Sequence, residues 1–362
     1  MASQEAPGQE GRIRLRLSPQ GEKYARRDAP VEARRMAARG ALPLEPLELA
    51  TVLFALVHDP DAQVKETARA SLENLPEHVL DPVLTGPAHP ALLSFLARVH
   101  KDDEARASQI ALNAAADDRT IAFLATLPLR AVVDIVSQNQ QRMMRCEEIV
   151  DALGSNPLTG RAVIERILSF LGMSPTEGER ADDAGAELSD DEAEAAMLEL
   201  LGDELAGFAG RLSAEHDDAI DEEEIASNLF AAVQKMTVMQ KVKLARLGGT
   251  EARALLIRDR NKVVASAAIT SPKITESEVV SYAQSRGLCD EVMRIIAANR
   301  DWTKSYQVKL ALATNPKVPQ AQAISFLNYL QDKELRTIMR SRDVPSAVST
   351  HARRILQKKG KL

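Results

Sequence analysis

The 362-residue chain has few aromatic side chains, two cysteines and no long apolar run. Aromatic residues make up 3% of the sequence and hydrophobic residues 45%, a balance that favours close-packed helices over sheets. Cys146 and Cys289 form no CxxC or Cys/His cluster with the spacing of metal ligands. The best apolar run, Leu49–Val57, is too short to span a bilayer, and Glu5 and Glu10 lie where a signal peptide would be apolar. We therefore expect an all-α protein in the cytoplasm, with both thiols buried and reduced.

The sequence also lacks the motifs of common catalytic sites. GxGxxG, GxxxxGK[ST], GxSxG and HExxH do not occur, and none of the six histidines form a pair at ligand spacing. The acidic run from Asp217 onward lacks the central glycine and the glutamate at the twelfth position of an EF-hand loop. The Gly248-Gly249-Thr250 stretch is explained by a helix C-cap followed by a threonine N-cap. We expect no enzyme activity, no cofactor and no metal site.

What the chain does contain is a repeat. The pair Arg-Asp occurs at Arg258-Asp259, Arg300-Asp301 and Arg342-Asp343, 42 residues apart each time. Each copy closes one apolar helical stretch and precedes another. A period of roughly 40 to 47 residues is typical of stacked helix pairs, in which a single hairpin cannot bury its own apolar face. The repeat predicts an α-solenoid of helical hairpins.

A helical hairpin is clearest near the N-terminus. An apolar helix ends at His58, and Asp59-Pro60-Asp61 forms a turn. The helix that follows carries apolar residues at helical spacing: Val64, Ala68 and Leu72. The segment 59–72 resembles a HEAT repeat, one of the armadillo-type helical repeats. The resemblance implies that Asp61 and Lys65 tie adjacent helices together, and it implies no particular activity.

The same layout returns further along the chain. An apolar helix ends at a polar turn that contains proline at 152–157, 264–272 and 308–316, and a second helix follows each time. We expect proline to stop the first helix and serine or asparagine to satisfy the end of that helix. These units resemble variant HEAT repeats, and the stretch 235–362 resembles a group of uncharacterised bacterial repeat proteins, which offers no activity to transfer. Prolines and a glycine at 82–90 indicate loops or a short irregular repeat.

Composition divides the chain into four parts. We predict a flexible arm at 1–30, HEAT-like repeats at 31–172, an acidic linker with an amphipathic helix at 173–224, and basic HEAT-like repeats at 225–362. Residues 177–224 carry a net charge of −17, whereas residues 235–362 carry +14. Such segregation indicates an electrostatic interaction, either inside the chain or with a partner.

The acidic part contains one candidate docking helix. A capping box at 189–192 precedes apolar residues on one helical face: Met197, Leu200, Leu201, Leu205 and Phe208. An isolated helix of this kind is marginal in water, so its apolar face must pack on something. Two interpretations stay open: the helix occupies a binding groove and regulates it, or it has a plain packing role.

The Arg-Asp turns supply the candidate partner surface. Its members are Arg258, Arg260, Lys262, Arg300, Trp302, Lys304, Arg340 and Arg342. A ladder of cations would attract phosphates or an acidic protein segment. Alternatively, each Asp caps a helix and each Arg bonds carbonyls of the neighbouring turn. Trp302 either anchors a partner or fills the gap between helices.

These observations favour a binding function over catalysis. The leading hypothesis is a non-enzymatic scaffold or adaptor that presents a helical-repeat surface to a protein with an acidic or helical segment, with the acidic insert as its candidate regulator. The second hypothesis is a nucleic-acid-binding HEAT-like protein that uses the basic C-terminal block.

Overall fold

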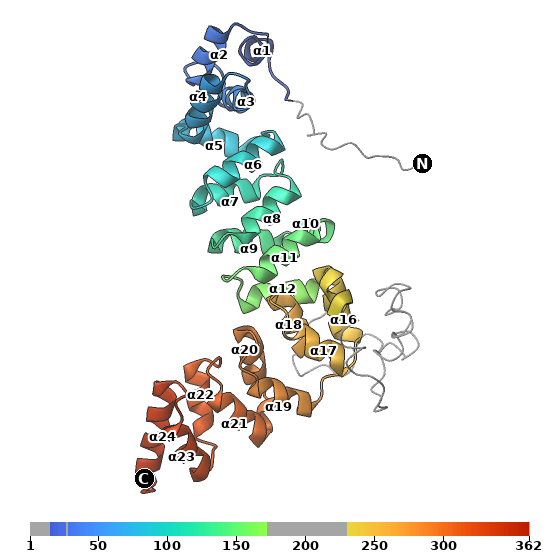
Figure 1. Cartoon of the computed structure of the whole chain (residues 1–362), viewed down its shortest axis with the longest axis vertical. Coiled ribbons are helices and arrows are strands. Elements are labelled where there is room, and N and C mark those ends of the chain that lie inside the picture. The colour runs from blue at the N-terminus through green and yellow to red at the C-terminus, as the bar shows by residue number, and fades with distance from the viewer. Residues whose placement is uncertain (1–14, 27, 172–229, 362) are drawn as a thin grey trace. The chain divides into compact units, whose positions relative to one another are not determined.

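The computed structural model describes residues 15–26, 28–171 and 230–361, and every regular element within these ranges is helical. The expectation of an all-α protein is confirmed for this part of the chain. Internal contacts divide the chain into two units (Figure 1): unit 1 is Met1–Leu158 and unit 2 is Thr159–Leu362.

Unit 1 consists of short helices joined by tight turns (Figure 1, blue to green). They are α1 (Pro19–Ala25), α2 (Val31–Ala38), α3 (Pro46–Leu56), α4 (Ala62–Glu73), α5 (Glu77–Thr85), α6 (Pro90–Val99), α7 (Glu104–Leu112), α8 (Asp118–Thr126), α9 (Arg130–Gln138), α10 (Gln140–Arg145) and α11 (Glu147–Ser155). Most helices pack on their second neighbour as well as on the next helix: α1 on α3, α2 on α4, α3 on α5, α5 on α7, and α7 on α9. Beyond α9 the short α10 intervenes, and α8 packs on α11.

The starts of these helices follow the capping rules. The side chains of Asp61, Asp103, Asp117 and Asn139 accept backbone N–H bonds at the starts of α4, α7, α8 and α10. Proline occupies the first position of α1, α3 and α6, where no intrahelical N–H bond is lost. Polar caps and prolines therefore set where most of these helices begin, whereas α9 and α11 start after Leu129 and Cys146 without a side-chain cap.

Two sequence-based expectations for unit 1 need correction. The arm expected at 1–30 includes α1, which begins after the Ser18 cap and packs on α3. Pro82 lies inside α5, whereas we expected a loop or an irregular repeat there. Four buried residues hold α5 in place despite the missing N–H of the proline: Val79, Leu80, Val83 and Leu84. Burial of apolar side chains outweighs the loss of one helical hydrogen bond.

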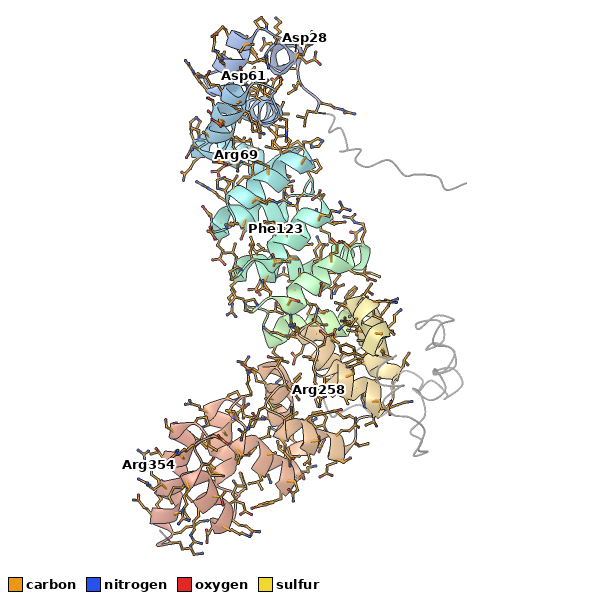
Figure 2. The ribbon with its side chains drawn as sticks, in the orientation of Figure 1. Asp28, Asp61, Arg69, Phe123, Arg258 and Arg354 are labelled. Carbon is orange, nitrogen blue, oxygen red and sulfur yellow. The ribbon has the colours of Figure 1, made fainter. Side chains whose placement is uncertain are left out.

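The hairpin expected at 49–75 is present as α3 and α4. The apolar residues predicted for α4, namely Val64, Ala68 and Leu72, are fully buried. Asp61 caps α4 and pairs with Arg35 across 3.4 Å (Figure 2). A shorter ion pair joins Asp59 to Arg34 of α2 at 2.5 Å, with both side chains almost fully buried. The cations that tie this turn to its neighbour thus precede it, and Lys65 is exposed.

Unit 2 contains the remaining helices that the structure describes. They are α12 (Arg161–Phe170), α16 (Val238–Leu247), α17 (Thr250–Leu256), α18 (Lys262–Ile269), α19 (Glu276–Gln284), α20 (Asp290–Ala298), η2 (Trp302–Lys304), α21 (Tyr306–Thr314), α22 (Gln320–Leu327), α23 (Asp332–Arg340) and α24 (Ser346–Lys358). Second-neighbour packing recurs: α16 on α18, α18 on α20, α19 on α21, and α22 on α24. Helix α12, which the sequence analysis placed with the N-terminal repeats, packs on α18.

The 42-residue period of unit 2 contains three helices. Helices α17, α20 and α23 end at Leu256, Ala298 and Arg340, so their ends are spaced by the same interval as the Arg-Asp pairs. Three α-helices lie between successive pairs: α18 to α20, and then α21 to α23. The helix pair expected from the period is thus extended by a third short helix.

In both units, buried asparagines link a helix to an earlier helix that packs beside it. Asn113 follows α7, and its amide nitrogen donates to the carbonyls of Leu84 and Gly86 at the end of α5, at 2.6 and 2.8 Å. Asn156, after α11, donates in the same way to Ala125 and Leu127 at the end of α8. We call each such residue an asparagine clamp.

A third asparagine clamp lies in unit 2. Asn315, after α21, donates to Ala283 and Ser285 at the end of α19, at 2.8 Å each. Ser271 holds the corresponding place after α18 and reaches Arg246 only at 3.5 Å. We expected these polar residues to satisfy the end of their own helix. Instead their side chains satisfy a helix about 30 residues earlier.

Candidate functional site

The predicted partner surface lies in the turns that follow α17, α20 and α23. The Arg258, Arg300 and Arg342 side chains are all exposed, and Figure 2 labels Arg258 in the first of these turns. In the described part of the chain, none of these three guanidinium groups pairs with a carboxylate or donates to a carbonyl. The alternative in which each Arg bonds carbonyls of the neighbouring turn is therefore wrong.

The three aspartates of the repeat play different roles. Asp259 is mostly buried, accepts the Asn261 N–H at 2.8 Å and pairs with Lys241 of α16 at 2.9 Å. Asp301 pairs with Lys304 at 2.6 Å, and the hydrogen bond from that lysine lowers the pKa of the carboxyl group. Asp343 forms an exposed pair with Arg286 at 3.2 Å. None of their side chains caps a helix. Asp301 stands at the N-cap position of η2 without a side-chain cap bond, and the caps of α18, α21 and α24 are Asn261, Ser305 and Pro345.

The other members of the predicted surface divide into exposed and structural residues. Arg260, Lys304 and Arg340 are exposed. Lys262 is half-buried, and its Nζ donates to the carbonyl of Thr159 at 3.3 Å, just ahead of α12. Trp302 is half-buried in η2 and thus neither fully exposed nor part of the core. Lys262 therefore supports the fold, and the exposed arginines and Lys304 face solvent.

Residues 235–362 have few carboxylates left to neutralise their cations. Residues 235–362 contain ten acidic side chains against 24 basic ones. At least seven of the ten already form ion pairs: Asp259, Glu278, Asp290, Glu291, Asp301, Asp332 and Asp343. The positive charge of residues 235–362 is consequently carried by exposed cations, which lie both in turns and on helices.

An exposed aromatic residue in contact with a lysine escaped the sequence analysis. Tyr329 is 65% exposed in the turn after α22. The Nζ of Lys309 lies 4.9 Å from the centre of the Tyr329 ring, a cation–π distance, and also contacts the Lys304 carbonyl at 3.4 Å. The sequence did contain a signal for Tyr329, because an aromatic residue in a polar turn is unusual in a chain with so few aromatic residues. We call Lys304, Lys309 and Tyr329 the α21 patch.

The candidate docking helix, with Met197, Leu200, Leu201, Leu205 and Phe208, lies outside the described residues.

The two thiols are less buried than expected. Cys146 and Cys289 are both half-buried and unpaired, and they stand at the N-cap positions of α11 and α20. Burial raises the pKa of the Cys289 thiol, and hydrogen bonds from Val292 and Glu291 only partly oppose this effect. The expectation of fully buried thiols is therefore wrong.

A buried polar cluster joins α17 to α19. Arg253 is fully buried and donates to both oxygens of Glu278, at 3.0 and 3.1 Å, and to the Gly248 carbonyl. Burial opposes ionisation of Glu278, but hydrogen bonds from Arg253 and Thr275 outweigh it and lower the pKa of the carboxyl group. Tyr282 donates to the same carboxylate at 3.3 Å, and burial raises the pKa of its phenol. Because its donors and acceptors are used within the cluster, the arrangement holds structure and leaves no group for chemistry.

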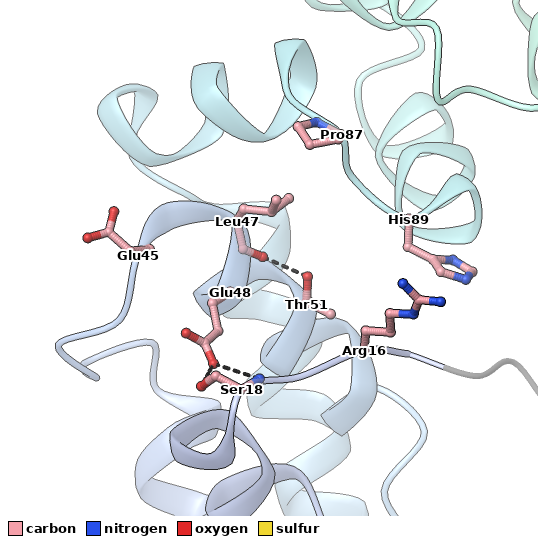
Figure 3. A pocket seen from close by; sticks show the side chains of 8 residues that line it. All are labelled: Arg16, Ser18, Glu45, Leu47, Glu48, Thr51, Pro87 and His89. Carbon is pink, nitrogen blue, oxygen red and sulfur yellow. Dashed lines mark hydrogen bonds between the residues drawn. The ribbon is translucent and has the colours of Figure 1, made fainter.

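A 620 Å³ pocket opens beside α3 and α6 in unit 1 (Figure 3). Most of its polar groups already have partners. Ser18 donates to Glu48 from both its hydroxyl and its N–H, the Thr51 hydroxyl donates to the Leu47 carbonyl at 2.6 Å, and the His89 Nδ1 accepts from an N–H of α6. Of the charged side chains, Arg16 and Glu45 remain exposed. Such a pocket offers no converging set of free groups for a ligand.

Metal binding and membrane crossing find no support among the residues that the structure describes. In that part of the chain no three His, Cys, Asp or Glu side chains form a group that could hold a metal ion. No described helix combines the length and the apolar character needed to cross a bilayer. No protein-family model, curated protein or solved structure matches the chain.

Proposed function

We propose that the protein is a non-enzymatic interaction scaffold whose basic C-terminal part binds an acidic segment of a protein partner. The observation that carries the proposal is the pairing of most carboxylates of 235–362, while Arg258, Arg300 and Arg342 stay exposed in equivalent turns. Exposed cations at a regular interval fit a partner with repeated acidic residues, because complementary charge speeds association and selects partners. Two free cysteines fit a reducing compartment such as the cytoplasm.

Second-neighbour packing and the asparagine clamps support a solenoid within each unit. In such an architecture each layer depends on the next for burial, and the stacked layers present a rigid surface. A rigid surface loses little conformational entropy when a partner docks. Under this proposal the HEAT-like layers hold the cationic turns at fixed intervals.

Charge reversal at the turns tests the proposal. We would prepare the triple variant Arg258→Glu/Arg300→Glu/Arg342→Glu, whose substituted side chains are all exposed. A labelled poly-glutamate peptide serves as the acidic probe, and fluorescence anisotropy measures its affinity. We expect the triple variant to bind the probe at least about tenfold more weakly than the wild type.

The matched control is Arg353→Glu/Arg354→Glu/Lys358→Glu, three exposed residues of α24 that change the net charge equally. If the turns form the site, the control variant loses much less affinity than the turn variant. Equal losses would mean that net charge alone attracts the probe, and the proposed surface would be abandoned.

Nucleic-acid binding is the second candidate, and the α21 patch is the observation that favours it. An exposed tyrosine in contact with Lys309 is suited to stacking on a base while the lysine contacts a phosphate. For this function a single-stranded oligonucleotide should bind more tightly than the poly-glutamate probe in low salt, and Tyr329→Ala should weaken its binding. An affinity for DNA that does not fall with rising salt would count against this candidate.

A further inference from the structure

A second surface, independent of the basic turns, lies in unit 1. A cavity of 670 Å³ opens between the end of α7, helices α8 and α9, and the short α10. We call it the α10 groove. Residues that line it include Leu112, Ile135, Gln138, Gln141, Arg142 and Arg145.

The groove has an apolar side that is open to solvent. Leu112, the last residue of α7, is 70% exposed, and Ile121, Ile135 and Val136 also line the groove. Met144 is likewise 70% exposed. It lies on α10 and does not line the groove. Leu112 continues the apolar lining formed by Ile121, Ile135 and Val136, so it belongs to an apolar wall and is not an isolated exposed residue.

The groove also carries a net positive charge at one end. Arg142 and Arg145 share the single carboxylate of Asp118. Hydrogen bonding to Arg145 lowers the pKa of Asp118, so two cations face one anion at neutral pH. Arg142 is mostly buried and donates to the Ala116 carbonyl at 2.7 Å, which ties it to the fold.

Arg145 is the cation at this end of the groove that can still bind a partner. Its side chain is 60% exposed, and it bonds Asp118 through Nε and one Nη only, at 2.6 and 2.7 Å. The other Nη is free to donate to a second carboxylate.

Neutral amides complete the rim. Gln138, Gln140 and Gln141 are all exposed, and each offers both a donor and an acceptor. Asn139 is used differently, because its side chain accepts the Arg142 N–H at the start of α10. Side-chain amides pair well with a peptide backbone, whereas an apolar wall and neutral amides give a nucleic acid little to bind.

We propose that the α10 groove docks a short peptide segment of a protein partner, in which an apolar side chain stands near a carboxylate. The apolar residue packs on Leu112, and the carboxylate binds the free Nη of Arg145. The glutamine amides hydrogen-bond the peptide backbone between these anchors. This site differs in place and chemistry from the basic turns of unit 2.

The test uses the full chain with the triple turn reversal of unit 2, so that binding by that surface is suppressed. The probe is a short labelled peptide of leucine, glutamate and serine, and its affinity is measured by anisotropy. Two further peptides replace every glutamate by lysine or every leucine by serine. We expect the first peptide to bind at least about tenfold more tightly than either of the other two.

Two substitutions test whether the peptide binds in the α10 groove. Leu112→Ser and Arg145→Gln each change an exposed side chain, and Asp118 keeps Arg142 as a partner. Each should weaken the leucine–glutamate peptide about tenfold, while Met36→Ser, an equally mild change at a 57% exposed residue of α2, should not. The proposal fails if all three peptides bind alike, if none binds, or if Leu112→Ser and Arg145→Gln leave the affinity unchanged.

Discussion

Units 1 and 2 share the asparagine clamp and differ in how they use charge. In unit 1, Arg34 forms an ion pair with Asp59, and both side chains are less than one tenth exposed. In unit 2, the buried pair is Arg253 with Glu278. Most other cations face solvent in both units, but residues 235–362 carry 24 basic side chains against ten acidic ones. The clamp is uncharged and satisfies backbone carbonyls, so it fits a stack of any net charge. The comparison indicates that the layers rest on neutral contacts and single buried ion pairs, so that most surface charges take no part in the packing.

The largest expected effect comes from breaking a buried ion pair. Arg253→Met should destabilise unit 2 by about 3–5 kcal/mol, because Glu278 keeps its charge in a buried site without its main partner. Arg34→Met should act similarly on unit 1 through Asp59. Hydrogen exchange resolved by peptide would assign the loss to one unit, which a single melting curve of a chain with two units would not.

The control for this prediction is an exposed pair of the same type. Asp343→Asn removes the partner of Arg286, but both side chains are about 60% exposed. Exposed pairs contribute roughly 0–1 kcal/mol, so exchange in α23 and α24 should barely change. If Asp343→Asn and Arg253→Met had equal effects, burial would not be what distinguishes the two pairs.

A smaller effect is expected from the clamps. Asn315→Ala should leave the carbonyls of Ala283 and Ser285 without their donor, at a cost of about 1–3 kcal/mol for each buried group. Asn113→Ala is the matched change in unit 1. Ser271→Ala should cost less than either, because its contact with Arg246 is already long at 3.5 Å. Chemical denaturation followed by hydrogen exchange ranks the three variants by their loss of unfolding free energy. If Ser271→Ala lost as much as the asparagine variants, the proposed role of the clamp would be contradicted.

Helices and their turns were predictable from the sequence because their signals are local. Asp61 stands before an apolar helical pattern, and that pattern fixed the buried face of α4 with Val64, Ala68 and Leu72. The partners of polar residues were not predictable. Asn315 bonds carbonyls 30 and 32 residues earlier, and Arg253 bonds a carboxylate 25 residues later. Sequence spacing shows which residue can cap the next helix and not which distant helix packs beside it.

Because sequence spacing does not show tertiary contacts, it predicted only part of the candidate surface correctly. The 42-residue interval found three equivalent turns with exposed arginines, because the interval is set by the ends of α17, α20 and α23. It did not separate Lys262, which contacts the Thr159 carbonyl, from the solvent-facing cations. It also gave no hint of the α10 groove, whose walls come from four helices that meet only after folding.

The smallest expected effect is a difference in pH response between the units. His100 in unit 1 is mostly buried, and burial together with the nearby Arg106 lowers the pKa of its ring, while Asp103 opposes this. The unfolded chain therefore takes up a proton near pH 6.5 and the folded chain only at lower pH. Between these values the unfolded state binds more protons, so stability of unit 1 falls as the pH falls through that window. Glu278 in unit 2 has a lowered pKa, so its contribution is kept at such pH and is lost only below about 4.5.

Comparing wild type with His100→Gln at each pH removes the intrinsic pH dependence of exchange. On going from pH 7.5 to about 5.5, exchange in α6 and α7 should accelerate more in the wild type than in the variant, whereas α17 and α19 should respond alike in both proteins. The groups that face the ring make this a demanding test, because Arg106 also contacts Asp103 and Glu77, at 3.4 and 3.9 Å. If the variant kept the full acceleration, the imidazole of His100 would not be the source of the acid sensitivity of unit 1.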